Sequence, residues 1–193
     1  MSNGFVIQIV DDDTVLVMTA AHGLLFKSSE YGKVDHPSMA EEHIRNRHVM
    51  IRFLCADSRD TWYEATELKR FSDFSLEVPS RLDFLDFAVL AVHVPKADRK
   101  NMTHLVLPLP SSSNAITVAR SPSLLLFWNE VGLFCGYDTK AAGIRTFSRQ
   151  YNMIAEPGAS GGPVFDDKAD FVAWHVHEIA DKRYGVHACY LSY

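Results

Sequence analysis

A serine among small residues is the first candidate for chemistry. Ser160 lies in the stretch EPGASGGP, residues 156–163. Gly158 has no Cβ, so the backbone can bend until its own N–H and that of Ser160 point at one spot. Two converging N–H donors, about 3 Å from an oxygen that gains negative charge, form an oxyanion hole. The stretch predicts either a nucleophilic serine with its oxyanion hole or a plain glycine-rich hairpin turn.

A histidine and an aspartate that can activate this serine lie upstream. His22 ends the apolar stretch VLVMTAAH, and Asp86 begins the apolar stretch DFAVL. A serine hydroxyl is a poor nucleophile until a base removes its proton, and His22 would be that base and then the acid for the leaving amine. Asp86 would accept the other ring N–H and stabilise the imidazolium, with Asp83 as the alternative acid. Taken singly, a core histidine and a strand-entry carboxylate are the plain alternatives.

Three motifs in a fixed order carry a family resemblance. TAAH at 19–22, DFAVL at 86–90 and GASGGP at 158–163 together resemble the trypsin-like serine proteases, in which histidine, aspartate and serine follow in this order. The Pro-Gly pair at 157–158 and the cysteine-poor sequence resemble the intracellular Deg/HtrA branch most. The resemblance runs from about Gly4 to the C-terminus.

The resemblance implies an all-β fold of two six-stranded antiparallel β-barrels with the active site between them. It also implies a catalytic triad of His22, Asp86 and Ser160, and an oxyanion hole from the backbone N–H groups of Gly158 and Ser160. The substrate would be a polypeptide, and no cofactor and no metal would be required. Family members have one more strand before the one that begins here at Gly4. We therefore expect an N-terminal barrel without its first strand, or a sequence that is incomplete at that end.

The resemblance also points to a specificity pocket. Its floor would be set six residues before the serine, at Ile154, with Ala155 next. Neither residue carries a carboxylate, so cleavage after Lys or Arg is not expected. Ala173, Trp174 and His175 would form the strand beside the substrate. A histidine there resembles the glutamyl endopeptidases and the viral chymotrypsin-like proteases, and predicts Glu or Gln at P1; a histidine packed at a strand end is the alternative.

A zinc site is a second hypothesis. His175 and His177, and likewise His187 and Cys189, are two residues apart, so each pair shares one face of its strand. A hairpin that turns near Lys182 would place His175 opposite Cys189 and His177 opposite His187. Three imidazoles and one thiolate would suit a closed zinc site.

A third hypothesis is a catalytically silent protease fold that acts as a protein-binding module. A fold does not determine a function, and the atypical start favours this hypothesis. The presence of all three catalytic residue types argues against it.

Composition sets further bounds. The chain has 193 residues with 47 % apolar residues, and its net charge is −5. This size suits one domain or two tightly joined halves, and neither nucleic acid nor an anionic membrane is an expected partner. Three widely spaced cysteines, 55, 135 and 189, do not form the even framework of a secreted domain. With no signal peptide and no membrane span visible, we expect an intracellular, cytoplasmic protein.

Short strands and turns dominate the chain, with no convincing long helix, which favours β-barrels. Residues 4–10 and 14–19 predict a hairpin around three aspartates, and the nearly all-apolar run 84–94 predicts a strand buried on both faces. The proline- and serine-rich stretch 108–114 is the predicted linker between an N-terminal half, 1–107, and a C-terminal half, 115–193. Other predicted strands are 48–54, 61–71, 116–118, 124–128, 132–136, 144–149, 171–177 and 185–191.

Overall fold

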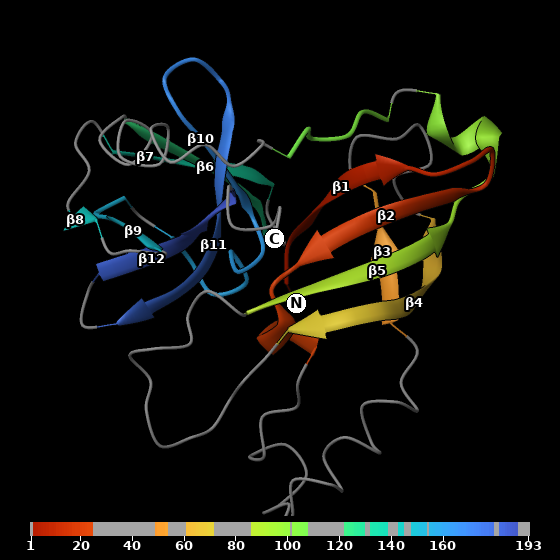
Figure 1. Cartoon of the computed structure of the whole chain (residues 1–193), viewed down its shortest axis with the longest axis horizontal. Coiled ribbons are helices and arrows are strands. Elements are labelled where there is room, and N and C mark those ends of the chain that lie inside the picture. The colour runs from red at the N-terminus through yellow and green to blue at the C-terminus, as the bar shows by residue number, and fades with distance from the viewer. Residues whose placement is uncertain are drawn as a thin grey trace, which may run out of the picture.

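The computed structural model consists of two antiparallel β-sheets that lie beside each other (Figure 1). Among the residues it describes there are strands and short 3-10 helices but no α-helix. The described residues are 2–24, 49–53, 61–71, 86–100, 102–107, 122–129, 132–138, 143–144, 148–153, 155–179 and 182–188.

The N-terminal sheet has five described strands in the order β1-β2-β5-β4-β3. Their bounds are β1 Gly4–Ile9, β2 Thr14–Thr19, β3 Val49–Arg52, β4 Trp62–Phe71 and β5 Phe87–His93. The predicted hairpin is confirmed: the Asp11 side chain accepts the N–H groups of Asp13 and Thr14 at 2.8 and 2.7 Å, which closes the β1–β2 turn. Two 3-10 helices follow strands of this sheet, η1 Ala21–Leu24 and η4 Lys96–Arg99.

The C-terminal sheet has seven described strands in the order β7-β6-β10-β11-β12-β9-β8. Their bounds are β6 Ser123–Trp128, β7 Leu133–Asp138, β8 Gly143–Ile144, β9 Ser148–Tyr151, β10 Pro163–Phe165, β11 Phe171–Ile179 and β12 Lys182–His187. Strand β6 alternates strictly between buried and half-buried side chains, so one face of the sheet covers the core of this half.

The N-terminal sheet has open edges at β1 and β3 in its described part. Residues 102–107 run along β1, where the Leu105 N–H donates to the Val6 carbonyl at 2.9 Å. The described part of this sheet holds five strands, and the expected absence of a first strand stays a prediction. The predicted linker 108–114 and the predicted strand 116–118 lie outside the described residues.

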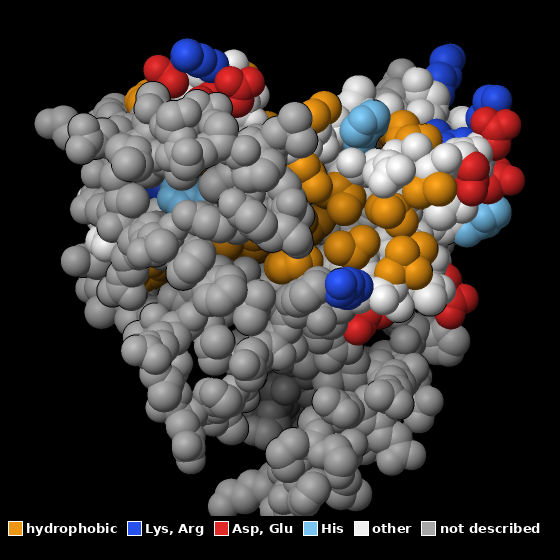
Figure 2. Space-filling view, in the orientation of Figure 1, with side chains coloured by type: hydrophobic (Ala, Val, Ile, Leu, Met, Phe, Trp, Pro, Cys, Tyr) orange, Lys and Arg blue, Asp and Glu red, His pale blue; other side chains and the backbone are white. Residues whose placement is uncertain are grey.

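Strand β5, near the centre of the N-terminal sheet, is apolar on both faces. In β5 the inward side chains of Ala88, Leu90 and Val92 are buried, and the outward Val89 and Ala91 are half-buried. Figure 2 shows apolar side chains gathered over this sheet, with acidic and basic side chains around its outer edge. The predicted burial of this strand on both faces is therefore complete on one face and partial on the other.

A third apolar cluster joins the two halves. It combines residues of β1 and β2 with residues of β11 and β12: Phe5, Met18, Phe171, Trp174, Val176, Val186 and Ala188. All seven side chains are buried. This packing fixes the C-terminal end of β2 and the start of β5 against β11, the place where the candidate site lies.

Candidate active site

His22 is held at the end of β2 by the backbone that leads into it. Ala20 and Ala21 are completely buried, and the chain then turns into η1, which begins at Ala21. Small side chains allow this close approach to the core. The His22 side chain itself stays 35 % exposed, so its ring is accessible to a substrate.

Asp86 contacts His22 twice. The carboxylate accepts the backbone N–H of His22 at 2.9 Å through Oδ1, and Oδ2 lies 2.5 Å from the ring atom Nδ1. Asp86 is only 5 % exposed, so water competes little for these contacts. A ring whose Nδ1 proton is shared with a buried carboxylate has Nε2 as its acceptor, which is the state a general base requires.

The aspartate is positioned in turn by the other half of the molecule. The indole N–H of Trp174, on β11, donates to the Asp86 backbone carbonyl at 3.2 Å. The ring of the next residue, Phe87, packs edge-on against the same indole, with centroids 5.8 Å apart. Trp174 is 1 % exposed, so it fixes the His22–Asp86 pair relative to the C-terminal sheet.

Ser160 lies in a tight loop whose peptide groups are held from several sides. Ala159 N–H donates to the Glu156 carbonyl, Gly162 N–H to the Ala159 carbonyl, and Gly161 N–H to the His175 carbonyl, at 3.0, 2.9 and 2.7 Å. Gly158 and Gly161 have φ values of 97° and 86°, which residues other than glycine rarely adopt.

The backbone N–H groups of Gly158 and Ser160 donate to no other group within the part of the chain that the structure describes. Two such donors in one loop can donate to a substrate oxygen that gains negative charge.

The Ser160 hydroxyl donates to the Val176 carbonyl at 3.0 Å. Within the described ranges no hydrogen bond joins it to His22. This contact places β11, from Val176 onward, directly beside the serine.

The comparisons with known proteins identify the fold. No protein-family model and no curated protein matches the sequence. Among solved structures, a Glu endopeptidase in complex with MPD has a TM-score of 0.59 at 11 % identity, over 99 % of this chain and 81 % of that chain. Rv3671c from M. tuberculosis H37Rv, in the inactive form of a serine-to-alanine mutant, has a TM-score of 0.53 at 17 % identity, over 97 % and 76 %.

The fold is that of the trypsin-like serine proteases. The predicted fold class, an all-β double barrel, is thereby confirmed. The predicted closeness to the Deg/HtrA branch stays a prediction.

The trypsin-like fold brings His175 together with a residue that sequence reasoning missed. The Tyr151 hydroxyl, on β9, lies 2.5 Å from His175 Nδ1, and both side chains are buried. Gly185 makes room for this pair, because a Cβ there would lie 3.2 Å from the Tyr151 hydroxyl and 3.0 Å from a backbone oxygen. Nothing in the local sequence around Tyr151 points to this contact.

Two further titratable residues lie in the same core. Arg149, on β9, is completely buried, and one of its Nη atoms donates to the Pro122 carbonyl at 3.1 Å. Burial, and secondarily the Arg149 charge, lower the pKa of His187 from 6.5 to about 4. Burial raises the pKa of Tyr151. At neutral pH, His187 and Tyr151 are therefore both uncharged.

The remaining predicted pocket residues differ in where they lie. Ala155 is half-buried and packs against the C-terminal core, and Ile154 lies outside the described residues, as does Asp83. Ala173 and Trp174 are 0 % and 1 % exposed and pair with β10.

The register on which the zinc hypothesis depended is wrong. His175 pairs with Gly185 and His177 with Tyr184, because the hairpin turns between Ile179 and Lys182, earlier than expected. His187 pairs with Ala173 instead. Cys189 lies outside the described residues, and within them no group of three or more His, Cys, Asp or Glu side chains is placed to hold a metal ion.

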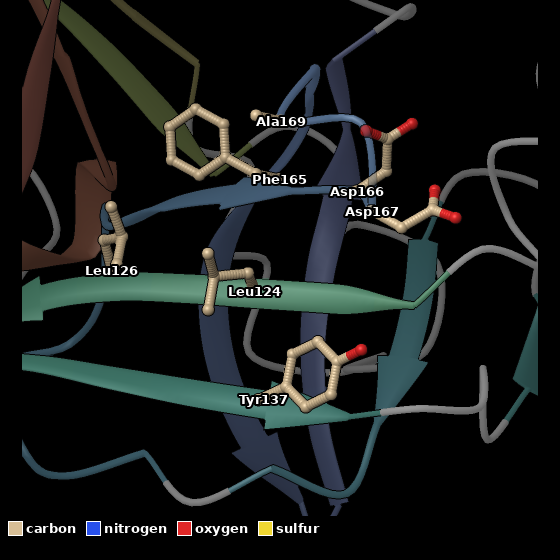
Figure 3. Close-up of a pocket in the computed structure, with 7 residues that line it drawn as sticks. All are labelled: Leu124, Leu126, Tyr137, Phe165, Asp166, Asp167 and Ala169. Atoms are coloured by element: carbon tan, nitrogen blue, oxygen red, sulfur yellow. The ribbon is translucent and has the colours of Figure 1, made fainter.

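A surface pocket of about 490 Å³ lies apart from these residues. Leu124 and Leu126 of β6, Tyr137 of β7 and Phe165 of β10 form its apolar wall, and acidic residues of the β10–β11 turn stand at its rim (Figure 3). Among the described residues, no helix is long and apolar enough to cross a membrane.

Proposed function

We propose that this chain is a serine endopeptidase that hydrolyses peptide bonds through an acyl-enzyme on Ser160. The observation that carries the proposal is the contact between His22 Nδ1 and the buried Asp86 carboxylate at 2.5 Å. A buried carboxylate that orients an accessible imidazole is the arrangement that activates a serine. The trypsin-like fold supports the same reaction class.

The reaction uses the chain's own residues alone. Ser160 Oγ attacks the scissile carbonyl carbon while its proton passes to His22 Nε2, and Asp86 stabilises the imidazolium that forms. The carbonyl oxygen becomes an oxyanion held by the N–H groups of Gly158 and Ser160. His22 then protonates the leaving amine, and a water activated by His22 hydrolyses the acyl-enzyme.

The serine must turn before it can react. Its hydroxyl donates to the Val176 carbonyl at 3.0 Å, and in the proposed reaction it exchanges that acceptor for His22. The exchange costs little, since one hydrogen bond replaces another.

We also propose that His175 binds a Glu or Gln side chain at P1. If the Tyr151 hydroxyl donates to Nδ1, the ring carries its proton on Nε2 and can donate to a substrate oxygen. The buried Arg149 guanidinium, two residues from Tyr151, adds a positive charge to this region. A similar solved structure is described as a Glu endopeptidase, which supports an acidic P1 residue.

The position of Val176 suggests which backbone the substrate meets. Because its carbonyl receives the Ser160 hydroxyl, we propose that the backbone of 176–178 pairs with an extended substrate. Ala173 and Trp174 would then support the site from within, and His175 would line the pocket.

Labelling with a fluorophosphonate probe tests the proposal, with wild type beside Ser160→Ala. We expect labelling of the wild type that is lost in the variant. A folded wild type that takes no label would contradict the proposal.

A library of peptide substrates, with wild type beside His175→Ala, tests the P1 preference. Cleavage after large apolar residues by both proteins would overturn that preference.

A catalytically silent, protein-binding form of the same fold is the second candidate. The observation that favours it is the Ser160 hydroxyl, which is bonded to Val176 rather than to His22. The same labelling experiment separates the two, because a silent fold carries no activated serine.

A further inference from the structure

Asn3 ties the loop of Ser160 to the rest of the site. Its side-chain Nδ2 donates to the Gly158 carbonyl at 2.6 Å and to the Trp128 carbonyl at 2.9 Å. Its Oδ1 accepts the Trp128 N–H at 2.7 Å. Its own backbone N–H donates to the Ser160 carbonyl at 2.8 Å. Both side-chain protons and the side-chain oxygen are therefore used, and each bond crosses from the N-terminal segment to the C-terminal half.

These bonds act on the peptide groups beside the two proposed oxyanion donors. The Gly158 carbonyl belongs to the peptide that follows the Gly158 N–H, and the Ser160 carbonyl belongs to the peptide that follows the Ser160 N–H. Gly158 is at a φ of 97° and has no Cβ to restrict it. Two bonds hold the peptide that follows the Gly158 N–H: within the loop the Ala159 N–H donates to the Glu156 carbonyl, and from outside the loop Asn3 donates to the Gly158 carbonyl.

One neighbouring hydroxyl holds Asn3 itself, and a second one holds the Ser160 carbonyl. Thr19 Oγ1 donates to the Asn3 carbonyl at 2.6 Å, and Ser2 Oγ donates to the Ser160 carbonyl at 2.7 Å. Gly161 leaves the space for this contact, since a Cβ there would overlap the Asn3 carbonyl oxygen. Asn3 is therefore fixed by Thr19 of β2, which lies three residues before His22. At the same time Asn3 holds the loop of Ser160.

We propose that Asn3 is the positioning residue of the oxyanion loop: its amide holds the Gly158 carbonyl so that the Gly158 N–H stays directed at the substrate oxygen. This rests on the proposed function, in which that N–H stabilises the oxyanion. Asn3 touches no reacting atom. It acts through the loop and couples the segment before β1 to the reactivity of Ser160.

The test compares Asn3→Ala and the isosteric Asn3→Asp with Gln8→Ala. Both Asn3 variants lose the donations to Gly158 and Trp128, and Asn3→Asp keeps the shape and the acceptor. Gln8→Ala removes an exposed amide side chain from β1, the strand that follows Asn3, and serves as the matched control.

The first measurement is hydrogen exchange over residues 155–162, which does not depend on catalysis. We expect faster exchange there in both Asn3 variants and wild-type exchange in Gln8→Ala. Exchange at the wild-type rate in folded Asn3 variants overturns the inference, whatever the activity.

The second measurement is hydrolysis of a p-nitrophenyl ester. Misplacement of a catalytic group by about 1 Å can cost about 100-fold in rate, so we expect kcat to fall by about that factor in the Asn3 variants, with KM changed less than about threefold. A fall in kcat of the same size in Gln8→Ala as in the Asn3 variants would contradict a positioning role. If the wild type neither hydrolyses the ester nor takes a fluorophosphonate label, the proposed function fails, and the catalytic part of this inference fails with it. The hydrogen-exchange data then decide the structural part alone.

Discussion

Replacement of Gly161 by alanine should damage the loop of Ser160 far more than the same replacement elsewhere. The new Cβ would overlap the Asn3 carbonyl oxygen and lie 2.8 Å from Thr19 Oγ1 and 2.9 Å from the Ala20 backbone nitrogen. Two of these three groups are backbone atoms, so relief requires the chain to move. The φ of 86° adds strain for any side chain. Gly132 offers the matched control, since a Cβ there would meet nothing within 4 Å.

The expected cost follows from two effects. A non-glycine residue in the left-handed conformation costs about 1–2 kcal/mol. An overlap with fixed groups in a packed region costs a further 1–3 kcal/mol, roughly. Gly161→Ala should therefore lower the free energy of unfolding by about 2–5 kcal/mol, whereas Gly132→Ala should change it by no more than about 0.5 kcal/mol.

Urea unfolding followed by tryptophan fluorescence measures the difference. With a slope of about 2 kcal/mol per molar urea, the expected cost moves the midpoint of Gly161→Ala down by roughly 1–2.5 M. Gly132→Ala should unfold with the wild type. Equal midpoints for the two alanine variants, at an unchanged slope, would refute the contact between Gly161 and the N-terminal segment.

Three further predictions concern single side chains. Asp86→Asn should lower the rate of fluorophosphonate labelling by about 10⁴-fold, because the amide favours the wrong tautomer of His22; a rate within tenfold of wild type would rule out this pair as the activating one. The unfolded chain takes up a proton on His187 near pH 6.5 and the folded chain only near pH 4, so stability present above pH 6.5 should be lost as the pH falls towards 4, by up to roughly 3 kcal/mol. Urea midpoints across this pH range should therefore fall less steeply in His187→Gln, and equal slopes would contradict the shift. Tyr151→Phe removes the hydroxyl 2.5 Å from His175 Nδ1 and should reduce the preference for Glu or Gln at P1 by about tenfold with unchanged labelling of Ser160, as peptide profiling would show.

The sequence alone was enough to predict the fold class and the candidate triad. The reason is that both depend on features between residues close together in the sequence. A hairpin such as β1–β2 depends on alternating apolar residues and on Asp11, whose side chain closes its own turn. Each of His22, Asp86 and Ser160 has the neighbours in sequence that its position requires. These neighbours are alanines for His22, apolar residues for Asp86 and glycines for Ser160. The order of these stretches along the chain was visible without any contact between them.

Only the tertiary structure decided how distant residues meet. Tyr151 reaches His175 across β9, β12 and β11, and Asn3 reaches Gly158 from the other end of the chain. Neither contact can be predicted from the local sequence, because a hydrogen bond between residues far apart in the chain does not restrict the residue types next to either partner. The register of β11 and β12 likewise depends on where the turn falls and on the bulge after His175, and a shift of a few residues changes which side chains face each other. Local chemistry thus predicted the candidate reactive groups, and long-range packing determined what holds them in place.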